Sequence, residues 1–418
     1  MTPRHDVIII GAGLAGLAAA RACVGAGLSP LVLEAGPDVG GRLTTDQVDG
    51  FLLDRGFQVL LDSYPEARSV LDFEALELGR FGAGALVRRA NGFGRVADPW
   101  RSPLAGVGSL LSGVFTVGDA WRMLRLRADA MLSLEGEPVE HGDVTAARAL
   151  NARGFSDRAI EGFFRPFFGG VLLDPQLSAP QHWFEFLFGM FATGSATLPA
   201  NGMQAIPRQL AAALPANTIR TNARVRALRD GQVELTDGEV LEARAVIVAT
   251  DARHAAVLIP GMRAPAWNAC ATLYYAAAAS PLDAPLLVLD GEGRRGPVNH
   301  VCVPSDIAPS YAPPGQALIS ATVVGTPPSD DAVLDRDARR QLTRWFGSQV
   351  STWRLLRIAH VPYSLPRTSP RPDTWDAAVR IGAGIYACGD HLETPSINGA
   401  LRSGRRAAEA VLADLTRR

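Results

Sequence analysis

Unbroken apolar runs, rather than strictly alternating ones, mark the strands predicted near the start of the chain. Residues 7–10 are all Val or Ile, and a second short run covers residues 30–33. Such runs are typical of parallel strands that are buried on both faces. Residues 246–252 repeat the pattern far downstream and end in small side chains. The chain is therefore predicted to be an α/β protein whose central sheet collects strands from distant segments.

A glycine-rich turn connects the first predicted strand to a helix. Residues 11–16 read GAGLAG, and an apolar helical pattern follows over residues 17–24. In this context the first glycine permits a sharp turn, the second lets the backbone approach a pyrophosphate, and the third lets the helix pack against the strand. The helix N-terminus favours the anion. Gly11, Gly13, Ala15 and Gly16 are therefore predicted to bind a dinucleotide.

The residue after the second strand narrows the choice of dinucleotide. Glu34 stands where a ribose should lie, and a carboxylate suits a free ribose better than a 2′-phosphate, so NADP is disfavoured. Residues 291–296 match the same glycine spacing, but Pro297 follows and no apolar helix begins there. We interpret that second copy as a loop between strands. The chain then has no credible second nucleotide site, such as a built-in NADPH site.

Further motifs decide between NAD and FAD. Gly40-Gly41-Arg42 follows Glu34 after a short loop, and residues 50–56 read GFLLDRG. Near the C-terminus a strand ends in Gly389-Asp390, and residues 395–405 begin a last helix. These segments resemble the FAD-dependent superfamily that includes phytoene desaturases, protoporphyrinogen oxidases and flavin amine oxidases. Residues 163–171 and 194–207 are most similar to the carotenoid-desaturase branch, and the resemblance runs from end to end.

The resemblance implies a fold and a cofactor. It implies a Rossmann-type FAD-binding domain, a parallel sheet with flanking helices, interleaved with a substrate domain of mixed or antiparallel sheet plus helices. We expect the FAD-binding domain to comprise residues 1–70, 200–255 and 375–418, and the substrate domain residues 71–199 and 256–374. It implies noncovalent FAD, because no cysteine is placed as in covalently flavinylated relatives. Besides the glycine turn and Glu34, the implied FAD contacts are Gly41, Arg42, Val225, Thr250, Gly389, Asp390, Ser396, Ile397 and Asn398.

Composition fits a large enzyme without a nucleic-acid partner. The 418 residues suggest about two or three domains. The net charge is −1, and acidic and basic residues are spread along the chain. The four cysteines are far apart and form no CxxC pair, which argues against a disulfide framework or a metal site and favours the cytoplasm. We expect no signal peptide and no membrane-spanning segment.

The basic residues carry an informative bias. All 41 are arginine, so the chain contains no lysine. Many amine oxidases of the superfamily place a lysine, through a water, next to flavin N5, and arginine is too basic and too bulky to replace it readily. This argues against a lysine-assisted amine oxidase. With no built-in NADPH site, the reduced flavin is expected to be reoxidised by dioxygen or a quinone.

Candidate catalytic side chains come from segments that the resemblance brings to the flavin. They are Arg55 and Gln58 after the Asp-Arg-Gly turn, His360 and Tyr363 in the segment AHVPY, and His391 directly after Gly389-Asp390. A histidine titrates near neutrality and could carry the proton that accompanies hydride transfer. The alternative for each is an ordinary hydrogen-bonding residue. His391 is the preferred candidate because its neighbours are expected to contact the cofactor.

Two segments leave alternatives open. Nine aromatic residues gather between Phe163 and Phe191, and they could form an apolar tunnel for a long hydrophobic substrate or simply a helical core. Segment Leu104 to Leu134 contains the arginine-rich run 121–127, which could lie on a membrane surface or be a plain helix with a solvated face. A peripheral association with a membrane is therefore one alternative for the protein's location.

The sequence thus predicts an FAD-dependent oxidoreductase. We expect it to dehydrogenate an apolar, isoprenoid-like or otherwise hydrophobic molecule by hydride transfer to flavin N5. The alternative among enzymes is an amine or porphyrinogen oxidase that works without a lysine. The alternative of another class is a noncatalytic carrier like the GDP dissociation inhibitors, although Glu34, Arg42 and Gly389-Asp390 argue for a complete FAD site.

Overall fold

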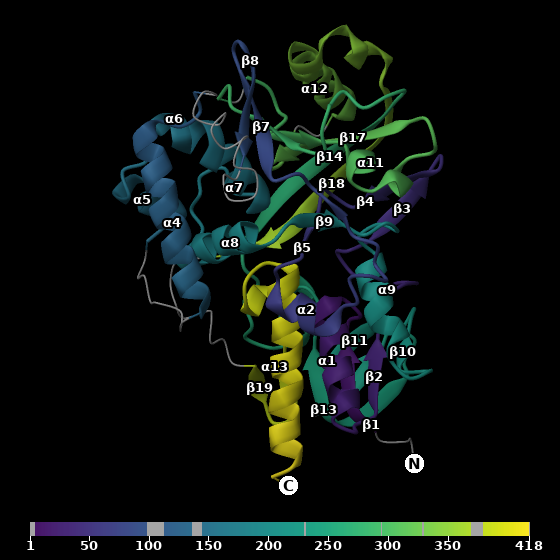
Figure 1. Ribbon diagram of the computed structural model, residues 1–418. Coiled ribbons are helices and arrows are strands. Elements are labelled where there is room, and N and C mark those ends of the chain that lie inside the picture. Colours follow the sequence, from purple (N-terminus) through teal and green to yellow (C-terminus); the bar gives the residue numbers. More distant parts are fainter. Residues whose placement is uncertain are drawn as a thin grey trace.

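The computed structural model describes residues 5–97, 113–135, 144–229, 231–293, 295–327, 330–368 and 379–417. The first and last expected FAD-binding segments and segment Leu104 to Leu134 extend beyond these ranges, and Arg294 lies outside them. Within the described residues the fold is α/β, as predicted. An eight-stranded and a seven-stranded sheet are joined by two smaller sheets and surrounded by helices (Figure 1).

The eight-stranded sheet is parallel at its centre. Its order is β10-β2-β1-β13-β12-β11, and β20 pairs with β13 while β19 pairs with β20. The strands that pair in parallel are β1 (His5–Ile10), β2 (Pro30–Leu33), β10 (Ile219–Arg220), β13 (Val240–Val248) and β20 (Ile385–Ala387). Antiparallel additions are β11 (Val225–Arg229), β12 (Gln232–Leu235) and β19 (Arg380–Gly382).

Both faces of this sheet are buried, which explains the unbroken apolar runs. Val7 and Ile9 pack on one face, with residues of α1 (Leu14–Gly25) and α13 (Ile397–Leu415). Ile8 and Ile10 pack on the other face, with residues of β12 and of α10 (Ala252–Leu258). Both faces therefore require apolar side chains from Val7 to Ile10 of β1.

The helices α1 and α13, from opposite ends of the chain, lie side by side (Figure 1). A Cβ atom added to Gly404 of α13 would lie 2.0 Å from the carbonyl oxygen of Ala15. The two backbones can approach this closely because α13 has no side chain at that position. This contact holds α13 against the start of α1, directly after the glycine turn.

The seven-stranded sheet has the order β18-β14-β17-β16-β15-β7-β8 and is antiparallel except between β15 and β7. Its strands are β7 (Gly84–Arg89), β8 (Gly92–Ala97), β14 (Trp267–Ala277), β15 (Leu287–Asp290), β16 (His300–Cys302), β17 (Ala317–Val324) and β18 (Arg354–Pro366). Leu273 and Tyr275 face α12 (Asp331–Phe346) and its core. Tyr274 and Ala276 belong instead to the core shared with α1 and α13, so the other face is turned toward the first sheet.

A helical group contains the aromatic-rich segment. It comprises α4 (Val117–Glu135), α5 (Ala146–Ala152), α6 (Asp157–Ala159), a π-helical turn (Ile160–Phe164), α7 (Arg165–Val171) and α8 (Gln181–Thr193). Phe164, Phe168 and Phe184 are fully buried in the core of this group. None of the described helices is long and apolar enough to cross a bilayer.

Short elements connect these units. They are the hairpin β3 (Thr45–Val48) and β4 (Phe51–Asp54), the small sheet of β5 (Leu60–Leu61), β6 (Gly79–Arg80) and β9 (Ala196–Leu198), the helices α2 (Pro65–Val70), α9 (Ala205–Ala212) and α11 (Pro304–Ile307), and 3₁₀ turns at Pro309–Tyr311, Gly347–Thr352 and Asp390–Leu392. The described residues between β15 and β16 form the connection predicted for the second glycine motif.

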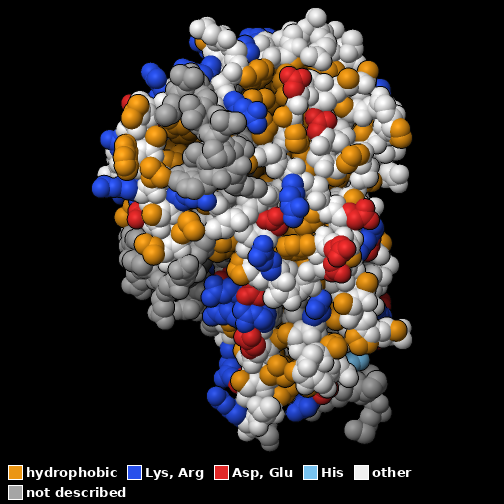
Figure 2. Space-filling model, viewed as in Figure 1, with side chains coloured by type: hydrophobic (Ala, Val, Ile, Leu, Met, Phe, Trp, Pro, Cys, Tyr) orange, Lys and Arg blue, Asp and Glu red, His pale blue; other side chains and the backbone are white. Residues whose placement is uncertain are grey.

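The two large sheets draw on separate sets of segments. The strands of the eight-stranded sheet fall within residues 1–70, 200–255 and 375–418, and those of the seven-stranded sheet within 71–199 and 256–374. The division of the chain into two domains at these boundaries stays a prediction. Acidic and basic side chains are interspersed on the face seen in Figure 2.

Candidate FAD site and adjoining cavity

A cavity of about 790 Å³ lies between the two large sheets. Its walls come from the glycine turn after β1, the end of β2, the turns after Gly40 and β4, helices α7 and α8, strands β14, β16 and β18, and the segment before α13. The volume is in the usual range for small-molecule and cofactor sites.

The glycine turn leaves its backbone open toward the cavity. Gly11 has a positive φ of +107°, which side-chain-bearing residues rarely adopt, and a Cβ atom at Gly13 would meet no atom within 4 Å. A Cβ atom at Gly16 would lie 1.9 Å from the carbonyl oxygen of Gly11, so Gly16 allows α1 to pack against the turn. No side chain caps the N-terminus of α1. Its free N–H groups are therefore available to a phosphate.

Glu34 lines the cavity at the end of β2. One carboxylate oxygen accepts a hydrogen bond from Ala12 N at 2.8 Å, and the other accepts one from Gly36 N at 2.7 Å. Each carboxylate oxygen has a second acceptor position, so the side chain can still accept hydrogen bonds from a ribose. Glu34 thus has a local structural role that the sequence did not reveal.

A second glycine turn faces the first. Gly40 N donates to the carbonyl oxygen of Ala12 at 2.9 Å. A Cβ atom at Gly41 would lie 3.6 Å from Gly13 Cα. Gly40 and Gly41 both have positive φ angles. The two turns together form a cradle of bare backbone with room for a pyrophosphate.

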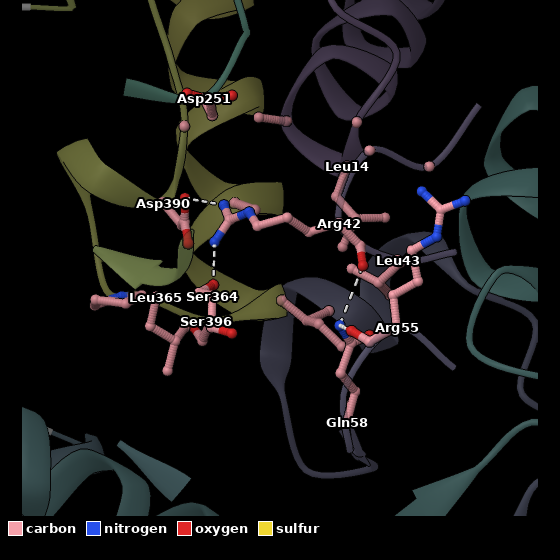
Figure 3. Close-up of a pocket in the computed structure, with 18 of the residues that line it drawn as sticks. Leu14, Arg42, Leu43, Arg55, Gln58, Asp251, Ser364, Leu365, Asp390 and Ser396 are labelled. Carbon is pink, nitrogen blue, oxygen red and sulfur yellow. Dashed lines mark hydrogen bonds and ion pairs between the residues drawn. The ribbon is translucent and has the colours of Figure 1, made fainter. Parts of the chain in front are cut away.

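Arg42 supplies a cation beside this cradle. Its guanidinium forms an ion pair with Asp390 and donates to the carbonyl oxygen of Ser364 at 2.9 Å (Figure 3). Burial lowers the pKa of Arg42, but the charge and hydrogen bond of Asp390 outweigh burial and raise the pKa above its ordinary value. Since 33% of the side chain remains accessible and it lines the cavity, the cation is available to an anionic ligand.

The turn after β4 brings Gln58 into the cavity wall. Its Nε2 donates to the carbonyl oxygen of Arg42 at 3.1 Å (Figure 3). Its Oε1 is buried and has no hydrogen-bond partner among the described residues. Arg55, three residues earlier in the chain, also lines the cavity and pairs with Asp46 at 3.4 Å. Gln58 therefore retains an acceptor for a bound molecule.

The segment before α13 closes the cradle. Gly389 has a φ of +151°, and Ser396 caps α13 by accepting a hydrogen bond from Gly399 N at 2.9 Å. Ser396 and Ile397 line the cavity. Asn398 does not line it, because its Oδ1 accepts a hydrogen bond from Glu66 N at 3.0 Å.

Val225 and Thr250 line the end of the cavity near Glu34. Asp251 follows Thr250, caps α10 and pairs with His254 at 2.7 Å. Burial raises the pKa of Asp251, but the hydrogen bond from His254 and the charges of His254 and Arg253 outweigh burial and lower the pKa. The Asp251 carboxylate is therefore already paired with groups of the protein itself.

Three of the five catalytic candidates do not line the cavity: His391, His360 and Tyr363. The ring of His391 lies against Gly389, and burial together with the Arg42 charge lowers its pKa although Asp390 raises it. His360 lies on β18 and pairs with Asp331 at 2.6 Å. Tyr363 is 43% exposed, and its ring lies 3.5 Å from the Arg253 guanidinium. Their catalytic roles stay predictions, whereas Arg55 and Gln58 are placed where they could contact a substrate.

The aromatic segment contributes both to a core and to the cavity wall. Phe167 of α7 and Trp183 and Phe191 of α8 line the cavity, while most of the remaining aromatic side chains pack in the helical core. Part of the segment therefore lines an apolar cavity, and the rest forms a helical core, so each of the two interpretations left open by the sequence applies to one part. The wall they form is apolar.

Several lining residues on the substrate side were not predicted from the sequence. Phe57, Cys270 and His300 all line the cavity. His300 lies on β16 with its ring centroid 5.3 Å from that of Phe57, and burial lowers its pKa to about 4. A histidine inside the apolar run Val-Asn-His-Val-Cys-Val was the available signal. All four cysteines are buried and unpaired.

These residues fit an FAD. The bare glycine cradle and the uncapped α1 suit the pyrophosphate, Glu34 suits a ribose, and Arg42 provides a cation. The unpartnered Oε1 of Gln58 suits a donor of the ligand. The cavity also extends beyond this cradle to the aromatic wall, which leaves space for a second molecule.

Comparison with known sequences identifies relatives. Residues 14–412 match the family described as flavin containing amine oxidoreductase. Putrescine oxidase of Kocuria rosea is 29% identical over 250 residues, which cover 54% of this chain and 49% of that protein. Protoporphyrinogen oxidase 2 of Arabidopsis thaliana is 39% identical over 66 residues, 16% of this chain and 13% of that protein. The matched segments thus span about half or less of these relatives.

Solved structures show the same fold over nearly the whole chain. Putrescine oxidase bound to putrescine aligns with a TM-score of 0.76 and 18% identity, over 99% of this chain and 100% of that one. Cyclohexylamine oxidase from Brevibacterium oxydans aligns with a TM-score of 0.71 and 18% identity, over the same shares. With the family matched from residue 14 to residue 412 and a cradle that fits its cofactor, the chain belongs to the flavin-containing amine oxidoreductases and is an FAD-dependent oxidoreductase.

Proposed function

We propose that this oxidoreductase dehydrogenates an apolar, isoprenoid-like or otherwise hydrophobic substrate in the aromatic part of the cavity. When bound, FAD supplies a hydride acceptor at its flavin N5. The protein positions the substrate, excludes water and handles the proton. The observation that carries the proposal is the continuity between the FAD cradle and the wall formed by Phe167, Trp183 and Phe191.

The charges of the lining support an uncharged substrate. Among the described lining residues the carboxylates are Glu34, Asp251 and Asp390. Glu34 holds backbone N–H groups, Asp251 caps α10 and pairs with His254, and Asp390 pairs with Arg42. None of them lies on α7, α8, β14 or β16, the elements of the aromatic part. A second ammonium group, such as that of a diamine, would therefore be buried there without a partner, which is unfavourable.

Gln58 and Phe57 are placed to position the substrate. Gln58 is held by the carbonyl oxygen of Arg42 and keeps its Oε1 unpartnered, so it can accept a hydrogen bond from the bound molecule. Phe57 contacts His300 and Phe81 on the substrate side. We propose that the reduced cofactor is reoxidised by dioxygen or a quinone.

The second candidate is oxidation of a monoamine without a lysine. The family match and the similarity to putrescine oxidase favour it. The chain has no lysine that could stand near the flavin, and arginine is a poor replacement. An uncharged amine with an apolar body would fit the same wall.

We infer further that α4 rests on a membrane surface, from which an apolar substrate can be collected, and that the protein otherwise resides in the cytoplasm. Val117, Trp121, Leu124 and Leu132 lie at helical spacing on the exposed side of α4, and each is at least 40% exposed. The helix packs against α8, which lines the cavity. Flotation with phosphatidylcholine vesicles tests this: Trp121→Glu should abolish binding, and Val240→Glu, which changes an exposed residue of β13, should not.

The substrate class is tested by anaerobic flavin bleaching. The purified protein is expected to be yellow and to release intact FAD on heat or acid denaturation, since the sequence places no cysteine in the manner of covalently flavinylated relatives. Polyenes, hydrophobic monoamines and a diamine are then mixed with it in the absence of oxygen. Bleaching by a polyene supports desaturation, bleaching by a monoamine supports the second candidate, and efficient bleaching by a diamine contradicts the uncharged aromatic site.

A further inference from the structure

A histidine with one unpartnered nitrogen lies inside the aromatic part of the cavity. His300 is 4% exposed and lines the cavity from β16. Its Nε2 is buried and has no hydrogen-bond partner among the described residues. Buried polar atoms are nearly always hydrogen-bonded, so an unpartnered one in a ligand cavity points to a partner on the ligand.

Asn299 determines which nitrogen of His300 carries the proton. Asn299 Nδ2 donates to the carbonyl oxygen of Pro166 at 2.9 Å and lies 3.1 Å from His300 Nδ1. An amide nitrogen has two hydrogens and no acceptor lone pair, so Nδ1 accepts in the second contact. In a neutral ring the proton is then on Nε2. Burial lowers the pKa of His300 to about 4, so the ring is neutral at physiological pH.

The ring is held in one orientation. A Cβ atom at Gly170 of α7 would lie 2.9 Å from both Asn299 Nδ2 and His300 Nδ1. The backbone of His300 pairs with Leu289 on one side and Thr322 on the other, which places β16 inside the sheet. A donor that is fixed in this way can select ligands by the position of their acceptor.

We propose that the Nε2–H group of His300 donates a hydrogen bond to the substrate, which is an apolar molecule with one uncharged acceptor atom, such as a carbonyl, ether or hydroxyl oxygen or an uncharged amine nitrogen. This rests on the proposed function, because it assigns the aromatic part of the cavity to the substrate. Phe57, whose ring centroid lies 5.3 Å from that of His300, and Phe167 and Leu287, which also line the cavity, have apolar side chains. His300 is thus a specificity-determining residue for the oxidation.

The test compares two probes of nearly equal shape, acetophenone and α-methylstyrene, which differ by a carbonyl oxygen in place of a methylene group. Binding to the FAD-loaded protein is measured by isothermal titration calorimetry. The parent should bind acetophenone roughly tenfold or more tightly than α-methylstyrene. His300→Phe should reduce the ratio to about one, and His300→Gln, which keeps an N–H donor, should retain part of it. The control His5→Phe changes a histidine of β1 that lies outside the cavity lining, and it should keep the parent ratio.

Several outcomes would overturn the proposal. They are equal affinities in the parent, no binding of either probe, or a preference that survives in His300→Phe. If His300→Phe keeps the preference for acetophenone but binds less FAD than the parent, Nε2 contacts the cofactor and not the substrate. The parent ratio decides the proposal even where His300→Phe does not fold. Failure of the proposed function is seen separately, as oxidation of a diamine or as absence of FAD from the purified parent.

Discussion

Arg42 and Asp390 form an ion pair in the cavity wall although 348 positions separate them in the sequence. Arg42 belongs to the second glycine turn, and Asp390 precedes α13. The pair therefore joins the first and last segments of the FAD site. The guanidinium is also held by the carbonyl oxygen of Ser364, on β18 of the other large sheet. One side chain thus couples the two sheets at the point where the cofactor is expected.

Asp390→Asn should weaken both the fold and FAD binding. Asp390 is 4% exposed, so its removal leaves the Arg42 cation without its counter-charge. Breaking a buried ion pair lowers the free energy of unfolding by about 3–5 kcal/mol. Because a third of the Arg42 side chain remains accessible, we expect a loss of about 2–3 kcal/mol for the apoprotein, measured by urea unfolding. The control is Glu161→Gln, which removes the partner of Arg165 and changes a side chain that is 57% exposed. Glu161→Gln should lower the free energy of unfolding by less than about 1 kcal/mol. Equal losses in the two variants would contradict a buried role for the Arg42–Asp390 ion pair.

Glu34→Ala should lower FAD affinity by roughly one to two orders of magnitude, measured by titration of the apoprotein with FAD. The carboxylate is expected to accept hydrogen bonds from the ribose, and it already holds the N–H groups of Ala12 and Gly36. The control Asp38→Asn changes a nearby carboxylate outside the lining and should alter the affinity less than threefold. If Glu34→Ala bound FAD as tightly as the parent, Glu34 would be a strand-end residue without a cofactor role.

Gly404→Ala should destabilise the protein. The added Cβ atom would lie 2.0 Å from the carbonyl oxygen of Ala15, which is backbone and cannot rotate away. The helices must separate, at a typical cost of about 1–3 kcal/mol in the free energy of unfolding. Gly25→Ala is the control, because a Cβ atom there meets nothing within 4 Å and alanine favours a helix. Denaturant unfolding of both variants should show a loss for the first and none for the second.

Local patterns were sufficient to predict the FAD side of the fold. A strand buried on both faces has no polar positions, and a turn that admits a pyrophosphate needs glycine, so Val7 to Ile10 and the glycine turn are visible in the sequence. The C-terminal and middle motifs were interpreted through a family resemblance. The parallel sheet brings these segments together because each strand is too short to be stable alone.

The substrate side was harder to predict because it depends on which face of a strand each residue occupies. His300 lies in the middle of the seven-stranded sheet, whereas His360 lies on β18 at its edge, and no local signal separates the two histidines. Tyr363 is on the same edge strand and is directed to Arg253. Pairing between strands distant in sequence decides these positions, and residue spacing does not reveal such pairing.

Stability should depend on pH through Asp54. Burial raises the pKa of Asp54 to about 6, although Thr45, Met203 and Tyr311 donate hydrogen bonds to it. A carboxyl group whose pKa rises on folding binds its proton more tightly in the folded state, so the free energy of unfolding decreases as the pH rises from about 4 to about 6. A shift of about two pKa units corresponds to about 3 kcal/mol.

The variant Asp54→Asn removes this titration while keeping the size of the side chain. The stability of the parent minus that of the variant should therefore fall by about 2 kcal/mol between pH 4 and pH 6, by about 3 kcal/mol over the whole transition, and stay constant above about pH 7. Urea unfolding at several pH values measures the difference. A difference that rises with pH would show that the three hydrogen bonds lower the pKa of the folded carboxyl below its ordinary value.

His391→Gln tests the proton-handling role predicted from the position of His391 after Gly389-Asp390. The ring is packed against Gly389, outside the cavity lining, and its Nε2 is buried without a partner among the described residues. If Nε2 takes up the proton, glutamine keeps the size and a hydrogen bond but cannot accept it, so flavin reduction should slow by about a hundredfold while FAD stays bound.

The pH dependence of the reduction rate gives an independent criterion. Burial and the charge of Arg42 lower the pKa of His391, against the opposing effect of Asp390 and Asp251, so the transition in the parent should lie below the ordinary value of about 6.5. It should be missing in the variant. Anaerobic single-turnover reduction, followed by flavin absorbance, measures both quantities. Rates within threefold of the parent, with the same pH profile, would make His391 a residue that positions the Gly389-Asp390 segment rather than a proton acceptor.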